Sequence, residues 1–359
     1  MGGSDISARE SETLALIERV RARPARFKDT QITMAHGAGG KATQTLVNGL
    51  FVPAFGGDAL RELGDAGVID GMAMTTDSFV VKPIRFPGGS IGELAVNGTV
   101  NDLAMAGARP LALTLSLVLE EGLSADDLRA EVEAIATAAA AAGVEIIAGD
   151  TKVVERGRCD SMYVTTTGLG RIDPRASLST GSLRPGDRIL VSGPIGEHGT
   201  AVMLARGEFE LEAPVVSDTR SLWPAVDALL ETVGPSLRCL RDATRGGVAS
   251  ALNELAQASG VAIVVREAAV PVRPAVSGAC EILGIDPMYV ANEGVMVVFV
   301  APEAASEALD TLVSAPGCAF AAEIGEVRTD PPGMVLVETA FGGRRVMDLL
   351  VGDPLPRIC

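Results

Sequence analysis

The sequence predicts a two-domain protein of mixed α/β (α+β) class. Its 359 residues suit about two domains, and a 47% share of hydrophobic residues is enough for large cores. Segments typical of strands and of helices follow one another in both halves, and a stretch rich in proline, serine, arginine and glycine over 172–186 divides them. We therefore expect an N-terminal extension over 1–30, a first domain over 31–175, a second over 176–346 and a tail over 347–359.

The elements of the first half follow from apolar periodicity and from capping residues. Ser124 followed by Asp127 is typical of a helix N-terminus, and an alanine-rich helix follows it. In order, we expect a short amphipathic helix at 11–23, a strand at 32–34, a helix from 43, a strand at 68–81, a helix at 91–107, a strand at 109–119, a helix at 124–142, and strands at 144–148 and 161–171.

The second half shows the same mixture. We expect strands at 188–192, 261–266, 295–300, 321–328 and 333–338, and helices at 197–206, 219–233, 247–259 and 303–314. Both halves combine strands with helices, which is why the mixed class is predicted for each.

Composition excludes several classes of function. The formal net charge of −16 argues against a surface for nucleic acid or anionic membranes, and 3% aromatic residues are few for stacking platforms. The five cysteines form no Cys-x-x-Cys pair and there are two histidines, so neither a zinc site nor a disulfide framework is expected. No signal peptide or membrane-spanning run is recognisable. We expect a cytoplasmic protein.

A glycine-rich loop followed by a lysine, residues 37–41, lies between a predicted strand and a predicted helix. Backbone N–H groups of successive glycines can face one anion, and a lysine beside them adds a positive charge. The spacing differs from that of a P-loop. The loop is therefore compatible with a phosphate site and with a plain glycine turn.

Four aspartates stand at the edges of turns built from glycine and small residues: Asp65, Asp77, Asp102 and Asp242. Each alone is compatible with a cap or a turn. Together with the glycine–lysine loop they indicate a Mg²⁺–nucleotide site, because Mg²⁺ prefers carboxylate and phosphate oxygens.

The chain ends in a segment, 352–359, whose last residue is Cys359. Pro354 and Pro356 fix φ and remove backbone donors, so this segment cannot end as a helix or a central strand. At about 3.1 Å per residue, an extended segment of this length reaches roughly 25 Å. It can be an incidental frayed terminus or an arm that carries a nucleophilic thiol to a distant pocket.

Seven motifs together resemble the hydrogenase maturation HypE family of the PurM-like superfamily, which includes aminoimidazole ribonucleotide (AIR) synthetase, selenophosphate synthetase and thiamine-monophosphate kinase. The resemblance covers about 31–359, and its most specific part is the C-terminal Pro-Arg-Ile-Cys. The sequence departs from the family pattern at Gly67, where alanine is expected. The motifs are His36–Lys41, Thr76–Ser78, Asn97–Pro110, Ala148–Lys152, Asp242–Gly247, Ala291–Gly294 and Pro356–Cys359.

The resemblance implies a PurM/AIR synthase-like fold, with an N-terminal domain that forms a barrel-like dimer core, a C-terminal α/β sandwich domain and ATP between the domains. It implies an ATP-dependent carbamoyl dehydratase that converts the S-carbamoyl group on its own terminal cysteine to a thiocyanate, the source of the CN ligands of the [NiFe]-hydrogenase iron. The implied partners are a HypF-type carbamoyltransferase, the HypC–HypD complex and a second copy of the chain.

Carried onto this sequence, the resemblance assigns the substrate thiol to Cys359 and proton handling to Glu293 and Lys152. The implied Mg²⁺ ligands are Asp77, Asp102 and Asp242, with Asp65. The implied nucleotide-binding residues are Gly37, Gly39, Gly40, Lys41, Asn101, Asp150, Thr151 and Thr244.

Two other functions remain open at this point. A selenophosphate synthetase usually has a reactive cysteine or selenocysteine close before the loop lysine, and residues 31–41 contain none. A non-catalytic carrier that only presents Cys359 would not need the nucleotide-binding residues. Both features favour the dehydratase.

Overall fold

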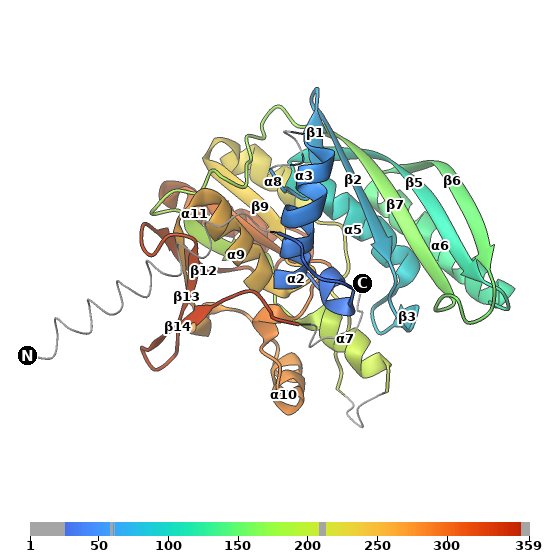
Figure 1. Ribbon diagram of the computed structural model, residues 1–359. Helices are drawn as coiled ribbons and strands as arrows, with labels where there is room; N and C mark the ends of the chain where they lie inside the picture. Colours follow the sequence, from blue (N-terminus) through green and yellow to red (C-terminus); the bar gives the residue numbers. More distant parts are fainter. Residues whose placement is uncertain (1–25, 58–59, 61, 208–212, 353–359) are drawn as a thin grey trace, which may run out of the picture.

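The computed structural model describes residues 26–57, 60, 62–207 and 213–352 (Figure 1). Two units lie side by side, each built on one main sheet, and neither sheet is closed. Between the end of the first unit at Ile172 and the start of the second at Arg188 there is no helix or strand. The helix predicted at 11–23 and the residue Cys359 lie outside the described residues.

The first unit is a five-stranded sheet in the order β1-β2-β7-β5-β6. Strand β5 pairs antiparallel with β7 and parallel with β6, and helix α6 (Ala125–Ala142) connects the two parallel strands. The Ser124 hydroxyl caps this helix, which ends at Gly143 with a φ of 69°. The strands are Gly67–Ile69, Met72–Phe79, Ala108–Glu120, Glu145–Val154 and Met162–Ile172 for β1, β2, β5, β6 and β7.

Helix α5 (Ile91–Met105) lies between the two units and contacts β2, β5 and β7 of the first and α8 and β9 of the second. All of its residues except Glu93 and Asp102 are buried. Alanines and glycines at many positions allow this close approach on every side. The helix therefore carries Asn101 and Asp102 to the junction of the units.

The second unit is a seven-stranded sheet in the order β14-β13-β10-β12-β8-β11-β9. Apolar side chains alternate along its central strands, so that Ile189 and Phe299 face helix α9 while Leu190 and Val298 face helices α8 and α11. The strands β8 to β14 are Arg188–Val191, Leu237–Asp242, Ala262–Arg266, Met296–Val300, Ala322–Arg328, Met334–Glu338 and Arg344–Met347. The helices are α7 (Glu197–Ala205), α8 (Trp223–Val233), α9 (Gly247–Ser259), α10 (Pro274–Leu283) and α11 (Ala305–Ser314).

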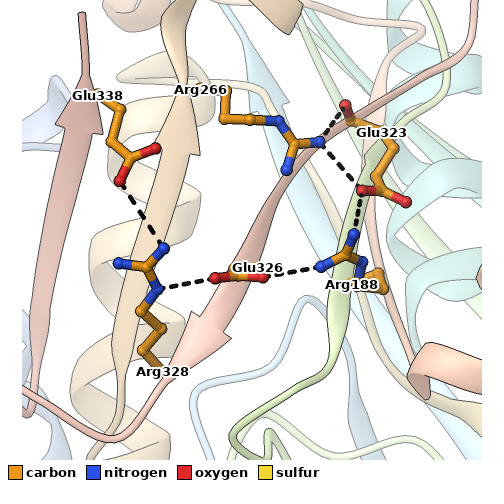
Figure 2. Close-up of polar contacts among 6 residues, drawn as sticks. All are labelled: Arg188, Arg266, Glu323, Glu326, Arg328 and Glu338. Carbon is orange, nitrogen blue, oxygen red and sulfur yellow. Dashed lines mark hydrogen bonds and ion pairs between the residues drawn. The ribbon is translucent and has the colours of Figure 1, made fainter. Parts of the chain in front are cut away.

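Part of the sheet face opposite α9 carries charged side chains of alternating sign (Figure 2). Glu326 lies between Arg188 and Arg328, at 2.7 Å from each guanidinium, and a hydrogen bond from Arg328 lowers the pKa of this carboxyl. Surface ion pairs contribute only about 0–1 kcal/mol each. Their main effect here is to keep this part of the sheet polar.

Several sequence predictions differ from the structure: β9 and α10 were not predicted, and β6 extends beyond the predicted 144–148. Three further differences have a local cause. The predicted strand 32–34 is wrong, because the Thr33 backbone and hydroxyl bond the His36 ring and start a 3-10 turn, η1 (Met34–Gly37). The predicted strand 68–81 is two strands, since Asp70 and Gly71 have φ values of 51° and 74° and form a hairpin turn. The helix predicted from 219 begins only at Trp223, because the preceding residues bond the junction at Asn101.

Short elements complete the fold. Helix α2 (Lys41–Leu46) continues through the π-turn η2 (Val47–Phe51) into α3 (Val52–Phe55). Strands β3 (Arg85–Phe86) and β4 (Gly89–Ser90) form a small hairpin before α5. Across the described segments of the chain, no helix combines the length and the apolar character needed to cross a membrane.

Candidate functional site

Three carboxylates from distant parts of the sequence meet at the junction of the two units. Asp65 precedes β1, Asp102 lies on α5 and Asp242 ends β9, and one oxygen of each lies within 4.8 Å of the others. The Asp102 carboxylate accepts a 2.6 Å hydrogen bond from the Thr75 hydroxyl. The buried Oδ2 of Asp242 has no hydrogen-bond partner. An orphaned carboxylate oxygen beside two other carboxylates fits a divalent cation.

Burial and mutual repulsion shift the acidity of this cluster. Burial raises the pKa of Asp65 to about 6, and the neighbouring Arg241 guanidinium, 2.9 Å away, opposes that shift. The pKa values of Asp102 and Asp242 lie well above the usual range, first because of burial and then because of the surrounding aspartates. A cation bound here would offset both the burial of these carboxylates and the repulsion between them.

A cavity of about 40 Å³ opens beside the cluster. This space suits a metal ion with a water molecule rather than a whole nucleotide. Its walls combine residues that the sequence analysis singled out with Arg245, which it missed although the same glycine-rich turn contains it. The residues that matter here are Asp77, Asp102, Asp242, Thr244, Arg245 and Glu293.

Glu293 is the most deeply buried acid in the cavity wall, with 3% of its surface exposed. It lies in the loop before β11, which the buried Asn292 ties to the Ala243 carbonyl oxygen beside Asp242. Burial raises the pKa of Glu293 well above its usual value, and the nearby Asp242 and Asp218 raise it further. A carboxylate with a raised pKa is a stronger base, which suits a proton acceptor.

Asn101, expected at the nucleotide, contacts the protein backbone instead. Its amide nitrogen donates to the carbonyl oxygens of Arg220 and Glu293, and its amide oxygen accepts from the Leu222 N–H. The side chain therefore joins α5 to two segments of the second unit.

The glycine loop 37–41 lies between the Asp242–Gly247 turn and the last described segment of the chain. A Cβ on Gly39, whose φ is 75°, would stand 2.7 Å from the Arg245 carbonyl oxygen, and one on Gly40 would stand 2.6 Å from that of Leu350. The Arg245 guanidinium donates to the Gly37 carbonyl oxygen. The glycines thus allow close approach of backbone on both sides.

Lys41 is engaged with that same C-terminal segment. Its N–H donates to the Leu350 carbonyl oxygen and its ammonium pairs with Asp348 at 2.7 Å. Tyr289 donates to the Asp348 carbonyl oxygen, which adds a third contact. Residues 348–350, which begin the C-terminal tail, are therefore held next to the turn that carries Thr244 and Arg245. Lys41 itself does not line the cavity.

Asp150, Thr151 and Lys152 lie away from the cavity, on the edge strand β6. Lys152 pairs with Asp150 at 2.8 Å, and both side chains are largely exposed. Within one chain the structure therefore separates Lys152 from Glu293, although the sequence analysis expected both beside the reacting group.

The four cysteines of the described part of the chain do not suit a nucleophile. Burial raises the pKa of each thiol, that of Cys239 to about 12, so they stay protonated. They are Cys159, Cys239, Cys280 and Cys318.

Comparison with known proteins gives the same architecture. The model of the AIR synthase related protein, N-terminal domain, matches residues 63–172, and that of the C-terminal domain matches 184–337. The chain is 46% identical to carbamoyl dehydratase HypE of Rhodobacter capsulatus over 93% of its own length and 99% of that protein.

Two solved structures extend the similarity to three dimensions. A chain from a HypE–HypF complex is 44% identical, with a TM-score of 0.82 over 85% of this chain and 99% of the other. A HypE in complex with ATP is also 44% identical, with a TM-score of 0.77 over 92% and 100%. The resemblance found in the motifs is confirmed: the chain belongs to the HypE family of carbamoyl dehydratases, within the AIR synthase related proteins.

Proposed function

We propose that this chain is the carbamoyl dehydratase of hydrogenase maturation. It binds ATP and dehydrates the S-carbamoyl group on its own Cys359 to a thiocyanate, which supplies the CN ligands of the [NiFe]-hydrogenase iron. The observation that carries this proposal is the cluster of buried carboxylates beside Glu293, in a chain that is 46% identical to a carbamoyl dehydratase over nearly its whole length.

The reaction removes the elements of one water molecule from the group S–C(=O)–NH₂. The C–O bond breaks, both N–H protons leave, and a C≡N bond forms. The carbamoyl oxygen is a poor leaving group, and Mg²⁺·ATP supplies the phosphoryl group with which that oxygen departs as phosphate. The protein must hold the metal, orient the tail and accept the protons.

We assign the metal to Asp65, Asp102 and Asp242, with Asp77 across the cavity. The orphaned Asp242 oxygen and the raised pKa values support this assignment. Thr244 and Arg245 line the same cavity from the adjoining turn, and Arg245 adds positive charge where phosphate oxygens would lie.

We assign proton acceptance to Glu293. Its carboxyl is buried beside the carboxylates of the cavity wall, and its raised pKa makes it a stronger base than an exposed glutamate.

Lys152 lies on the edge strand β6, where we propose that a second copy of the chain binds. Strand β6 is a free sheet edge with exposed Ile147 and Val153, a surface suited to pairing with a second copy. A homodimer formed across β6 would build a barrel-like core and bring Asp150, Thr151 and Lys152 toward the cavity of the partner. We propose that Lys152 acts there to stabilise charge.

The proposed partners supply and remove the one-carbon group. A HypF-type carbamoyltransferase would load Cys359, which is supported by the similarity to a HypE solved in complex with HypF. The HypC–HypD complex would accept the cyano group. The cytoplasmic location remains a prediction.

The metal assignment predicts that Asp102→Asn weakens Mg²⁺-dependent ATP binding at least about tenfold while the fold persists, because one negative ligand is lost. Titration calorimetry with Mg²⁺ and ATP measures this. The affinity should also fall as the pH drops through 6, since protons then compete with Mg²⁺ for Asp65. The exposed turn variant Asp70→Asn is the control. Equal affinity in all three proteins contradicts the assignment.

The role of Glu293 predicts that Glu293→Gln binds ATP and accepts the carbamoyl group but forms thiocyanate at least about 100-fold more slowly, since the proton acceptor is gone. Mass spectrometry of the C-terminal peptide separates the two modifications by the mass of water. Thiocyanate formation at the normal rate would remove Glu293 from the mechanism.

The action of Lys152 across the dimer predicts complementation. Lys152→Ala alone should show a defect similar to that of Glu293→Gln or milder. Mixed dimers of the two variants should regain activity, because one site then holds an intact Glu293 from one chain and an intact Lys152 from the other. Mixing without recovery, once dimer exchange is verified by mass, would place Lys152 in the site of its own chain or outside the reaction.

The tail assignment predicts that Cys359→Ser leaves the melting temperature and ATP binding unchanged but abolishes thiocyanate formation, since a serine ester cannot yield one. One residue appended after Cys359 should also impair the reaction. Cys159→Ser is the matched control and should react normally. Modification of any other cysteine would contradict the assignment of the substrate thiol.

A further inference from the structure

The peptide of Glu293 is held on its N–H side by an acid that the mechanism does not use. One oxygen of the Asp218 carboxylate accepts from the Glu293 N–H and the other from the Gly294 N–H, both at 3.2 Å. Asp218 is itself buried, with 8% of its surface exposed. The two acceptors of one carboxylate therefore fix two successive peptide groups.

The carbonyl side of the same peptide is held from α5. The Asn101 amide nitrogen donates to the Glu293 carbonyl oxygen at 3.1 Å, and its other contacts, to Arg220 and Leu222, tie down the chain that follows Asp218. Because Asp102 is the next residue on α5, the position of Glu293 is linked directly to a proposed metal ligand.

Glycine at 294 is required by this arrangement. A Cβ there would overlap the Asp218 carbonyl oxygen and would stand 2.8 Å from the Arg220 Cγ. The segment 218–220 thus packs directly on the peptide after Glu293, and only a residue without a side chain permits the contact.

Burying a carboxylate to hold these two N–H groups is energetically unfavourable. Asp218 lies near Glu293 in a region already crowded with buried acids, and burial raises its pKa in spite of the backbone hydrogen bonds. Asparagine would fill the same space without charge, but its amide has a single oxygen, so its NH₂ group, which donates, would face one of the two N–H groups. The carboxylate is retained where two donors must be held at once.

We propose that Asp218 is a positioning residue for the dehydration: together with Asn101 it fixes the Glu293 peptide so that the Glu293 side chain lies in the cavity wall with Asp77, Asp102 and Asp242. This inference rests on the proposed role of Glu293. It places the effect of Asp218 on the rate of the chemical step rather than on nucleotide affinity, because small displacements of a catalytic group cost rate.

The test is the single-turnover conversion of the carbamoylated full-length chain with Mg²⁺ and ATP, followed by mass spectrometry. Asp218→Asn keeps the shape and loses one acceptor. We expect the conversion rate to fall at least about tenfold while the Kd for ATP stays within about twofold of the original. An unchanged rate, or a parallel loss of ATP affinity, overturns the inference.

Asp187→Asn is the matched control for lost stability. Asp187 is also a buried aspartate that accepts a backbone N–H, from Arg184, and it faces Arg238 away from the cavity. It should lower the melting temperature about as much as Asp218→Asn without slowing conversion. An equal rate loss in both variants would mean that the effect is one of general stability.

A double variant shows whether Asp218 acts through Glu293. Glu293→Asp keeps a carboxylate but displaces it. If Asp218 works by placing that group, adding Asp218→Asn to Glu293→Asp should slow conversion by less than about twofold further. Multiplied effects of the two substitutions overturn the inference.

The two proposals can fail separately. A normal rate for Glu293→Gln refutes the proposed function of Glu293, whereas a slow Glu293→Gln with a normal Asp218→Asn refutes only the positioning role. If Asp218→Asn does not fold, Asn101→Ser tests the other contact, because it removes the hydrogen bond from the Asn101 amide to the Glu293 carbonyl oxygen. The same loss of rate at constant ATP affinity is then expected, and a normal rate overturns the inference.

Discussion

The main physical constraint on this structure is the burial of several negatively charged carboxylates at the junction of its two units. Asp65, Asp102 and Asp242 lie together with Asp77 and Glu293 nearby, and burial raises the pKa of most of them. Such a cluster is unfavourable unless cations or protons compensate it. Arg241 compensates Asp65 and Glu254, through contacts of 2.9 and 2.5 Å. The orphaned oxygen of Asp242 leaves the cluster ready for a metal ion.

Helix α5 holds the two units in place around that cluster. Small side chains let it lie between two sheets with almost every residue buried, so its position cannot shift without disturbing both cores. Its adjacent residues have different contacts: Asn101 holds the Glu293 peptide, and Asp102 belongs to the carboxylate cluster. A single rigid element thus fixes the relative positions of the proposed metal site and the proposed base.

The glycine loop connects this site with the C-terminal segment. Gly39 and Gly40 pack against the backbones of Arg245 and Leu350. The same loop therefore contacts both the turn that lines the cavity and the start of the C-terminal tail. The Lys41–Asp348 pair is partly exposed and contributes only about 0–1 kcal/mol, in addition to the backbone hydrogen bond from Lys41 to Leu350.

The sequence by itself determined the mixed class, most helices and strands, the family, and which aspartates stand beside small-residue turns. These features are local: a helix shows its period and its caps, and a motif shows its residues in consecutive order. Helix α6, with Ser124 and Asp127 at its start and an alanine-rich sequence after them, was predicted for this reason.

Tertiary structure alone decided which residues meet. It separated Lys152 from Glu293 within one chain, because β6 is an edge strand, and it turned Asn101 toward backbone groups more than 100 residues away in sequence. It also gave Asp218 its role, which sequence reasoning had no means to find. The hydrogen bonds of Asp218 close a loop of 75 residues, and nothing in local periodicity reports a contact over that distance.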